Sequence, residues 1–165
     1  MKTLLLIRHA KSDWTHLGAR DYDRRLNQRG CIDAPEMGRR LMKRNLVPEF
    51  FVASSAERAR LTATLITQTI TFPEEQLEWR KELYLASPAT MLEVIGQTPA
   101  HVDVLALLAH NPGITELAES LSKQRFDNVP TAGIVTLSAD IKSWDEAHCD
   151  WQLRDFDYPK RDFKS

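Results

Sequence analysis

The sequence has few cysteines and no long apolar run. Its two cysteines, Cys31 and Cys149, provide neither the spacing of a metal-binding cluster nor a disulfide framework. The apolar run near the N-terminus covers only residues 3–7 and carries no cleavage site. Because a signal peptide needs a longer apolar region, we expect none and assign the protein to a reducing cytoplasm.

The sequence also lacks an excess of charge of one sign. Its 22 lysine and arginine residues nearly balance its 23 aspartate and glutamate residues, which gives a net charge of -1 at pH 7. A balanced chain offers no broad basic surface, so we expect neither a nucleic acid nor a membrane as a partner. A local group of arginines is therefore interpreted as a defined binding site.

The remaining composition is that of a globular protein with alternating strands and helices. With 42% hydrophobic and 27% charged residues, the chain 1–165 is expected to form one domain. Apolar runs and helical periodicity predict strands at 3–7, 50–53, 76–79, 102–109, 134–137 and 152–156, and helices near 32–45, 57–70, 88–95 and 112–121. This alternation predicts an α/β fold of three layers, a largely parallel central sheet with helices on both faces.

Two of the predicted strands end in a histidine. Residues 3–7 lead into Arg8-His9, and residues 102–109 lead into His110. Ligands of parallel α/β sheets bind just outside the carboxyl ends of the strands. Either histidine alone would be interpreted as a structural residue. Two histidines at one edge of a sheet, with arginines nearby, indicate a site that handles phosphate.

A third strand end adds another arginine. The strand at 50–53 is followed by Ser54-Ser55 and then by Arg58. Ser55 is expected to be a helix N-cap, which would place Arg58 in the first helical turn. A helix N-terminus with a positive side chain favours an anion. Alone, Arg58 would be interpreted as a solvated helix residue, but the two histidines favour a phosphate contact.

These blocks resemble the histidine phosphatase superfamily, which includes phosphoglycerate mutase-like enzymes. Within it the chain is most similar to the small phosphohistidine phosphatases of the SixA type. The resemblance extends over residues 3–140 and follows the order of blocks in the family. The blocks that carry it are Arg8-His9-Ala10, Arg24, Arg29-Gly30, Ser54-Ser55-Ala56-Glu57-Arg58-Ala59 and His110-Asn111-Pro112.

The resemblance implies a phosphatase that acts through a covalent phosphohistidine, with His9 as the nucleophile. Arg8 and Arg58 would hold the phosphate, because a guanidinium can bind two oxygens at a time. His9 has to be neutral to attack. We expect the arginine charges to lower its pKa, and a backbone carbonyl to fix its tautomer. The arginines already supply positive charge, so we expect neither a metal nor a cofactor.

The resemblance assigns the remaining phosphate contacts to His110, to the backbone N–H of Asn111 and to Arg24. Arg24 lies in a predicted loop, and Arg25 stands where the family usually has proline. The residues alone therefore leave open whether Arg24 or Arg25 faces the phosphate, although Arg24 is favoured.

A candidate general acid follows the predicted strand at 76–79. Many members of the superfamily use a carboxylate in this region to protonate the leaving oxygen, and Glu82 lies at about the same place. The alternative is a salt bridge between Glu82 and Arg80. A phosphoramidate needs less help from an acid than an alkyl phosphate, because its nitrogen is more basic than an ester oxygen and can already carry a proton.

The segment between Glu82 and residue 102 has room for one short helix. The pocket is therefore expected to be shallow and open, which suits a phosphorylated partner protein, such as a histidine phosphotransfer domain. The alternatives are an enzyme for small phosphorylated substrates and a non-catalytic phosphate-binding module. His16, His101 and His148 have no supporting context and are expected at the surface.

Overall fold

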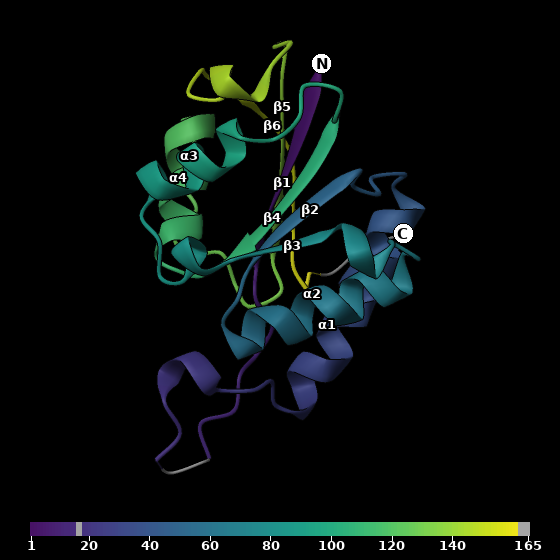
Figure 1. Ribbon diagram of the computed structural model, residues 1–165, viewed down its shortest axis with the longest axis vertical. Helices are drawn as coiled ribbons and strands as arrows, with labels where there is room; N and C mark the ends of the chain where they lie inside the picture. The colour runs from purple at the N-terminus through teal and green to yellow at the C-terminus, as the bar shows by residue number, and fades with distance from the viewer. Residues whose placement is uncertain (16–17, 162–165) are drawn as a thin grey trace.

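The computed structural model describes residues 1–15 and 18–161. Within these residues six strands form one sheet in the order β3-β2-β4-β1-β5-β6 (Figure 1). Neighbouring strands from β3 to β1 are parallel, whereas β5 is antiparallel to both β1 and β6. The sheet is thus mixed, with the parallel strands together. The strands are β1 (Lys2–Arg8), β2 (Phe50–Ser54), β3 (Leu77–Arg80), β4 (Val104–Ala109), β5 (Ile134–Ala139) and β6 (Gln152–Asp157).

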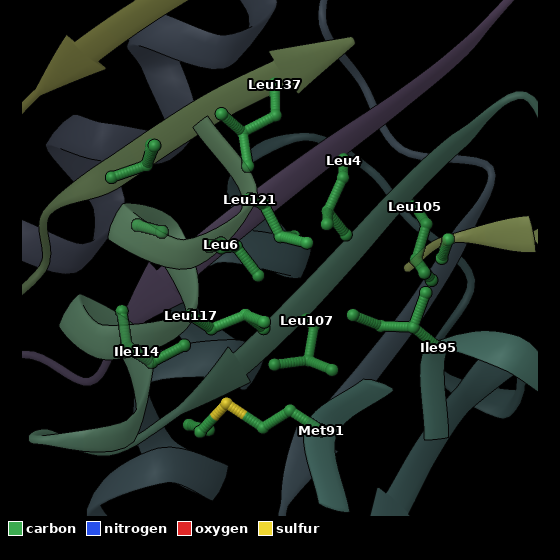
Figure 2. Packing of buried hydrophobic residues seen from close by; sticks show 14 of the residues in the cluster. Leu4, Leu6, Met91, Ile95, Leu105, Leu107, Ile114, Leu117, Leu121 and Leu137 are labelled. Atoms are coloured by element: carbon green, nitrogen blue, oxygen red, sulfur yellow. The ribbon is translucent and has the colours of Figure 1, made fainter. Parts of the chain in front are cut away.

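Helices cover both faces of the sheet, which confirms the predicted three layers. In Figure 1, α1 (Gln28–Lys43) and α2 (Glu57–Thr69) lie on one side, and α3 (Pro88–Gly96) and α4 (Gly113–Ser122) lie on the other. Successive residues of a strand point to opposite faces. Leu5 and Ile7 of β1 accordingly pack in the core under α1 and α2, whereas Leu4 and Leu6 pack in the other core. Figure 2 shows this second core, in which Leu4 and Leu6 lie close to side chains of α3 and α4.

Helix α1 begins about one turn earlier than the sequence predicted. Its first residue is Gln28, because the side chain of Asn27 accepts a hydrogen bond from the Gly30 N–H and caps the helix. A Cβ at Gly30 would lie 2.2 Å from the carbonyl oxygen of Lys11. Glycine therefore allows the loop that follows β1 to pass directly over the start of α1.

The expectation that Ser55 caps α2 is wrong. The N-cap is Ala56, whose side chain cannot accept a hydrogen bond, and the hydroxyl of Ser55 contacts the Tyr22 hydroxyl at 2.5 Å instead. The hydroxyl of Ser54 accepts a bond from the Ala56 N–H at 3.3 Å. Arg58 nevertheless lies in the first turn of α2, as predicted, because the helix begins at Glu57.

Two surface predictions are confirmed and one lies outside the described residues. His101 and His148 are exposed, whereas position 16 is not among the residues that the structure describes.

None of the helices within residues 1–15 and 18–161 combines the length and the apolar character needed to cross a bilayer.

Candidate active site

The structure brings His9 and His110 together at the ends of two adjacent strands. Arg8 pairs with Ala109 in the parallel register of β1 and β4, and a histidine follows each of these two residues. The His9 N–H donates to the Ala109 carbonyl at 3.2 Å, and the two imidazole centroids lie 5.2 Å apart. The juxtaposition predicted from the strand ends is therefore present.

Hydrogen bonds fix the ring of His9. Its Nδ1 lies 2.7 Å from the carbonyl oxygen of Ala10, and the hydroxyl of Thr62 holds this turn by accepting the Ala10 N–H at 2.9 Å. The Nε–H of Arg58 donates toward Nε2 of His9 at 3.4 Å. Since a carbonyl oxygen can only accept, Nδ1 carries the proton and Nε2 carries the free electron pair.

Burial keeps both histidines neutral. It is the largest cause that lowers the pKa of His9 to about 3, and the charges of Arg58, Arg8 and Arg24 lower it further. Burial likewise lowers the pKa of His110 to about 3. The sequence predicted that the arginine charges would keep His9 neutral. In the structure these charges contribute, but burial contributes more.

Arg58 and Arg8 reach the same pocket from different elements. Arg58 is 3% exposed and donates to the backbone oxygen of Asp21 at 2.7 Å and to its carboxylate at 3.1 Å. One terminal nitrogen of Arg8 donates to the Val129 carbonyl at 3.0 Å. The Nε of Arg8 is buried and has no hydrogen-bond partner among the described residues. Arg8 therefore keeps a donor that an anion could use.

Arg24, rather than Arg25, lines the pocket with His9. The guanidinium of Arg24 donates to the Ser12 hydroxyl and to the Asp21 carboxylate, and it lies 3.5 Å from the centre of the Trp14 ring. Arg25 is exposed and lines a separate hollow beside Leu26. The structure thus orients the arginine favoured from the sequence toward the site.

The pocket has a volume of about 530 Å³ and a positive lining. The lining contains four cationic side chains and a single carboxylate, that of Asp21. This excess of positive charge indicates an anionic ligand. Within residues 1–15 and 18–161 the structure contains no cluster of histidine, cysteine, aspartate and glutamate with the make-up of a metal site. The lining residues are Arg8, His9, Lys11, Ser12, Trp14, Asp21, Arg24, Asn27, Arg58, Leu85, His110, Asn111 and Thr131.

Asn111 lines the pocket, and its side chain organises the surrounding loops. Its amide nitrogen donates to Asn128 at 2.8 Å and to the Val129 carbonyl at 3.1 Å. Its amide oxygen accepts bonds from the backbone and the hydroxyl of Thr115 in α4. Because the side chain is fully used in this way, the backbone N–H predicted from the sequence remains the group that Asn111 can offer to a ligand.

The structure does not bring Glu82 into the pocket lining. Its carboxylate accepts a hydrogen bond from Arg80 at 2.9 Å, and this bond lowers the pKa of Glu82. A general acid that works near neutral pH needs a raised pKa. The salt bridge, which was the alternative from the sequence, is present in this structure, and these contacts do not favour Glu82 as the general acid.

Three polar residues of the site were missed from the sequence. Asp21 joins Arg24 and Arg58. Tyr84 donates to Asp21 and packs edge-on against His110 at 5.5 Å, and Ser54 contacts His110 at 2.7 Å. Burial alone would raise the pKa of Asp21, but hydrogen bonds from Tyr84 and the arginines lower it to about 2. The spacing of Asp21 and Arg24, three residues apart, was a signal for the first of these contacts.

The depressed pKa values of His9 and His110 predict a fold that loses stability in mild acid. In the unfolded chain both imidazoles titrate near about 6.5, whereas in the folded protein they do so at about 3. Between these values the unfolded state binds more protons, so the stabilisation is complete above pH 6.5 and declines as the pH falls toward 3. We expect the free energy of unfolding to fall by on the order of 4 kcal/mol between pH 7 and pH 5, about 2 kcal/mol from each imidazole.

Chemical denaturation at the two pH values measures this loss. A variant that lacks both imidazoles, H9N/H110N, should show a clearly smaller fall between pH 7 and pH 5. An equal fall in the variant and the wild type would mean that other groups cause it.

Comparison with known proteins relates this chain to one family. The family model of the histidine phosphatase superfamily (branch 1) matches residues 4–111. An uncharacterized chloroplastic protein of Arabidopsis thaliana is 28% identical over 159 residues, which cover 88% of this chain and 70% of that protein.

Two solved structures have the same fold. A candidate phosphohistidine phosphatase SixA from Agrobacterium tumefaciens has a TM-score of 0.82 and 26% identity, over 96% of this chain and 98% of that chain. The protein histidine phosphatase SixA complexed with tungstate has a TM-score of 0.77 and 18% identity, over 95% of this chain and 97% of that chain. Because the family model matches more than half of the chain, including His9, Arg58 and His110, this protein belongs to the histidine phosphatase superfamily, branch 1.

Proposed function

We propose that this protein is a phosphohistidine phosphatase that transfers the phosphoryl group first to His9 and then to water. The proposal rests on the tautomer and the orientation of the His9 ring. Its Nδ1 is held by the Ala10 carbonyl at 2.7 Å, and its Nε2 faces the Arg58 guanidinium at 3.4 Å. A neutral, fixed imidazole beside a cation is suited to attack a phosphorus atom whose oxygens that cation holds. The likeness to a SixA structure at 26% identity supports this reading.

The reaction consists of two displacements at phosphorus. In the first, the Nε2 electron pair of His9 attacks, and the bond from phosphorus to the leaving nitrogen or oxygen breaks. The leaving group keeps the bonding electrons and takes up a proton. In the second, water attacks the phosphorus of phospho-His9, Nε2 regains its electron pair, and inorganic phosphate departs. Arg8 and Arg58 stabilise the charge on the phosphoryl oxygens in both steps.

A substrate phosphate has to compete with Asp21 for the arginines. The Asp21 carboxylate accepts bonds from Arg58 and Arg24 in this structure. Nε of Arg8 and Nδ1 of His110 are buried without a hydrogen-bond partner among the described residues. A phosphate that displaces Asp21 therefore gains the arginine donors, and the two unpartnered nitrogens can supply further ones.

The mouth of the pocket supports a protein substrate. Trp14 and Leu85 line the pocket and are 75% and 56% exposed. The segment that joins β3 to β4 contains one short 3-10 turn and α3, so it provides little to cover the site. Exposed apolar side chains around a charged pocket suit a phosphohistidine on the surface of a partner, such as a histidine phosphotransfer domain. A small phosphorylated metabolite remains the alternative substrate, and a non-catalytic phosphate-binding module is the alternative class.

Phosphate release from a panel of four substrates tests this proposal. The panel contains a phosphohistidine domain, a phosphoserine peptide, a sugar phosphate and p-nitrophenyl phosphate. We expect the highest kcat/KM for the phosphohistidine domain. A clear preference for the sugar phosphate would favour the metabolite enzyme. Phosphate binding without release from any substrate would favour the non-catalytic module.

Replacement of Glu82 by glutamine is expected to change activity little. Because Glu82 pairs with Arg80 and does not line the pocket, release from the phosphoserine peptide should fall by well under 10-fold. Loss of a true general acid typically costs about 10²–10⁴-fold. Glu78→Gln is a matched control, since Glu78 is the other carboxylate partner of Arg80. A loss above 100-fold on phosphoserine alone would restore Glu82 as the acid.

Activity is expected to survive exhaustive chelation. Arg8, Arg24 and Arg58 supply the positive charge that metal ions supply in metallophosphatases. Vanadate should inhibit, because it resembles the five-coordinate phosphorus of the transition state. The measurement compares turnover before and after dialysis against a chelator. Loss of activity that a divalent ion restores would contradict the expectation.

A further inference from the structure

The buried ring of His110 has one nitrogen in contact with Ser54 and one without a partner. His110 is 1% exposed, and its Nε2 lies 2.7 Å from the hydroxyl oxygen of Ser54. Nδ1 has no hydrogen-bond partner among the described residues. The sheet register brings the two residues close. Ala53 pairs with Leu108 across β2 and β4, so Ser54 at the end of β2 lies beside Ala109, the residue before His110.

A count of donors and acceptors around Ser54 assigns the proton in this contact. The hydroxyl is fully buried, can donate one hydrogen bond and can accept two. It already accepts the Ala56 N–H at 3.3 Å. If Nε2 of His110 donated, the hydroxyl proton would have no acceptor among the described residues, and Nδ1 would be a buried acceptor without a donor. If the hydroxyl donates to Nε2, a single unpartnered group remains, the Nδ1–H of His110.

We propose that Ser54 is a positioning residue, which holds His110 in the Nδ1–H tautomer so that this N–H donates to the phosphoryl group. The inference rests on the proposed function for the identity of the acceptor. Both histidines then carry their proton on Nδ1, but one offers an electron pair to the ligand and the other offers an N–H. His9 is held through Nδ1 and offers the electron pair of Nε2, whereas His110 is held through Nε2 and offers the Nδ1–H.

In this arrangement His9 attacks the phosphorus and His110 donates a hydrogen bond to the phosphoryl group. A neutral His110 can donate to an anion only if the proton is on the nitrogen that faces it. The edge-on contact with Tyr84 restrains the His110 ring, but an aromatic ring does not select a tautomer. Among the described residues Ser54 is the partner that can make this selection, because it is the group within hydrogen-bond distance of the His110 ring.

Nitrogen NMR of the imidazoles in the free protein tests the tautomer without any substrate. We expect a protonated Nδ1 and an unprotonated Nε2 for His110 in the wild type. Addition of vanadate should shift the Nδ1 resonance, as this N–H finds an acceptor. A protonated Nε2 in the free protein, or an Nδ1 resonance that vanadate leaves unchanged, would overturn the inference. Because these readouts need no turnover, they stand apart from the proposed phosphatase activity.

Variants at position 54 test the effect on the reaction. Ser54→Ala should lower kcat about 10- to 100-fold with little change in KM, as is typical when the partner of a catalytic group is lost. The same variant should give His110 a mixture of tautomers. Ser54→Thr keeps a hydroxyl and should restore both the wild-type tautomer and most of kcat, so it serves as the rescue.

Ser122→Ala is the matched control for loss of a buried hydroxyl. The Ser122 hydroxyl donates to the Ala118 carbonyl at 2.7 Å in α4, outside the pocket lining. This variant should lower the Tm by a similar amount while leaving the His110 tautomer and kcat unchanged. Equal losses of kcat in Ser54→Ala and Ser122→Ala, or no change of tautomer in Ser54→Ala, would make the role of Ser54 merely structural.

Discussion

Replacement of His9 by alanine is expected to lower turnover of every substrate by at least about 10⁴-fold, as is typical when a nucleophile is lost. The covalent route depends on the electron pair of His9 Nε2, which lies 3.4 Å from Nε of Arg58. Among the described residues no other side chain presents an unprotonated nitrogen to this guanidinium. The fold should survive, because His9 lines an open pocket and its loss enlarges that pocket rather than creating an enclosed cavity. Circular dichroism and a steady-state assay measure the two effects.

A trapping experiment identifies the atom that carries the phosphoryl group. Wild-type protein that is mixed with radiolabelled substrate and quenched in base should carry the label on His9. His101→Ala is the matched control, since this imidazole is exposed and outside the pocket, and both labelling and turnover should be retained. A label on another residue, or most of the activity left in His9→Ala, would exclude His9 as the nucleophile.

Replacement of Arg58 by alanine is expected to slow release from all four substrates by about 10²–10³-fold, the usual cost of one lost transition-state donor. Arg58 is buried beside Nε2 of His9 and presents its guanidinium where charge develops on the phosphoryl oxygens. That group is common to every substrate, so the factor should be similar across the panel. Arg58→Lys should lie in between, because an ammonium keeps the charge but loses the two-pronged geometry.

The neighbouring Arg60 provides the control for this variant. It is exposed on the same helix and lies 4.5 Å from the ring of Trp79, outside the pocket. Arg60→Ala should therefore retain wild-type turnover. If Arg58→Ala slowed one substrate and spared the others, Arg58 would contact the leaving group rather than the phosphoryl group.

The sequence alone predicted the architecture and the meeting of the candidate site residues for a physical reason. A strand buried on both faces appears as a continuous apolar run, so the first polar residue after the run marks the end of the strand. Parallel strands end at the same edge of the sheet. The apolar runs therefore place Arg8, His9 and His110 together from the sequence alone, and the register of β1 with β4 places them so.

The sequence could not decide between Arg24 and Arg25, because both lie in an irregular loop without periodicity. The decision comes from pairing between the two ends of this loop, which joins β1 to α1. Ser12 forms a bridge with Leu26, and the Asp13 N–H donates to the Arg25 carbonyl at 2.7 Å. With Leu26 buried, Arg25 points to solvent and Arg24 points back toward Ser12 and the pocket.

The choice of carboxylate also depended on tertiary structure. Glu82 was selected by its position along the chain, but its charge is satisfied by Arg80 close by in the sequence. Asp21 reaches Arg58 across 37 residues and Tyr84 across 63, and such distances leave no local pattern in a single sequence.

The sequence by itself thus determined which strands are buried, where they end and which candidate site residues follow them, because these properties depend on neighbours along the chain. The tertiary structure decided which arginine faces inward, which carboxylate joins the arginines and which nitrogen of each histidine is free. Each of these depends on a hydrogen-bond partner from another element, as with Ala10 and Thr62 around His9, and Ser54 beside His110.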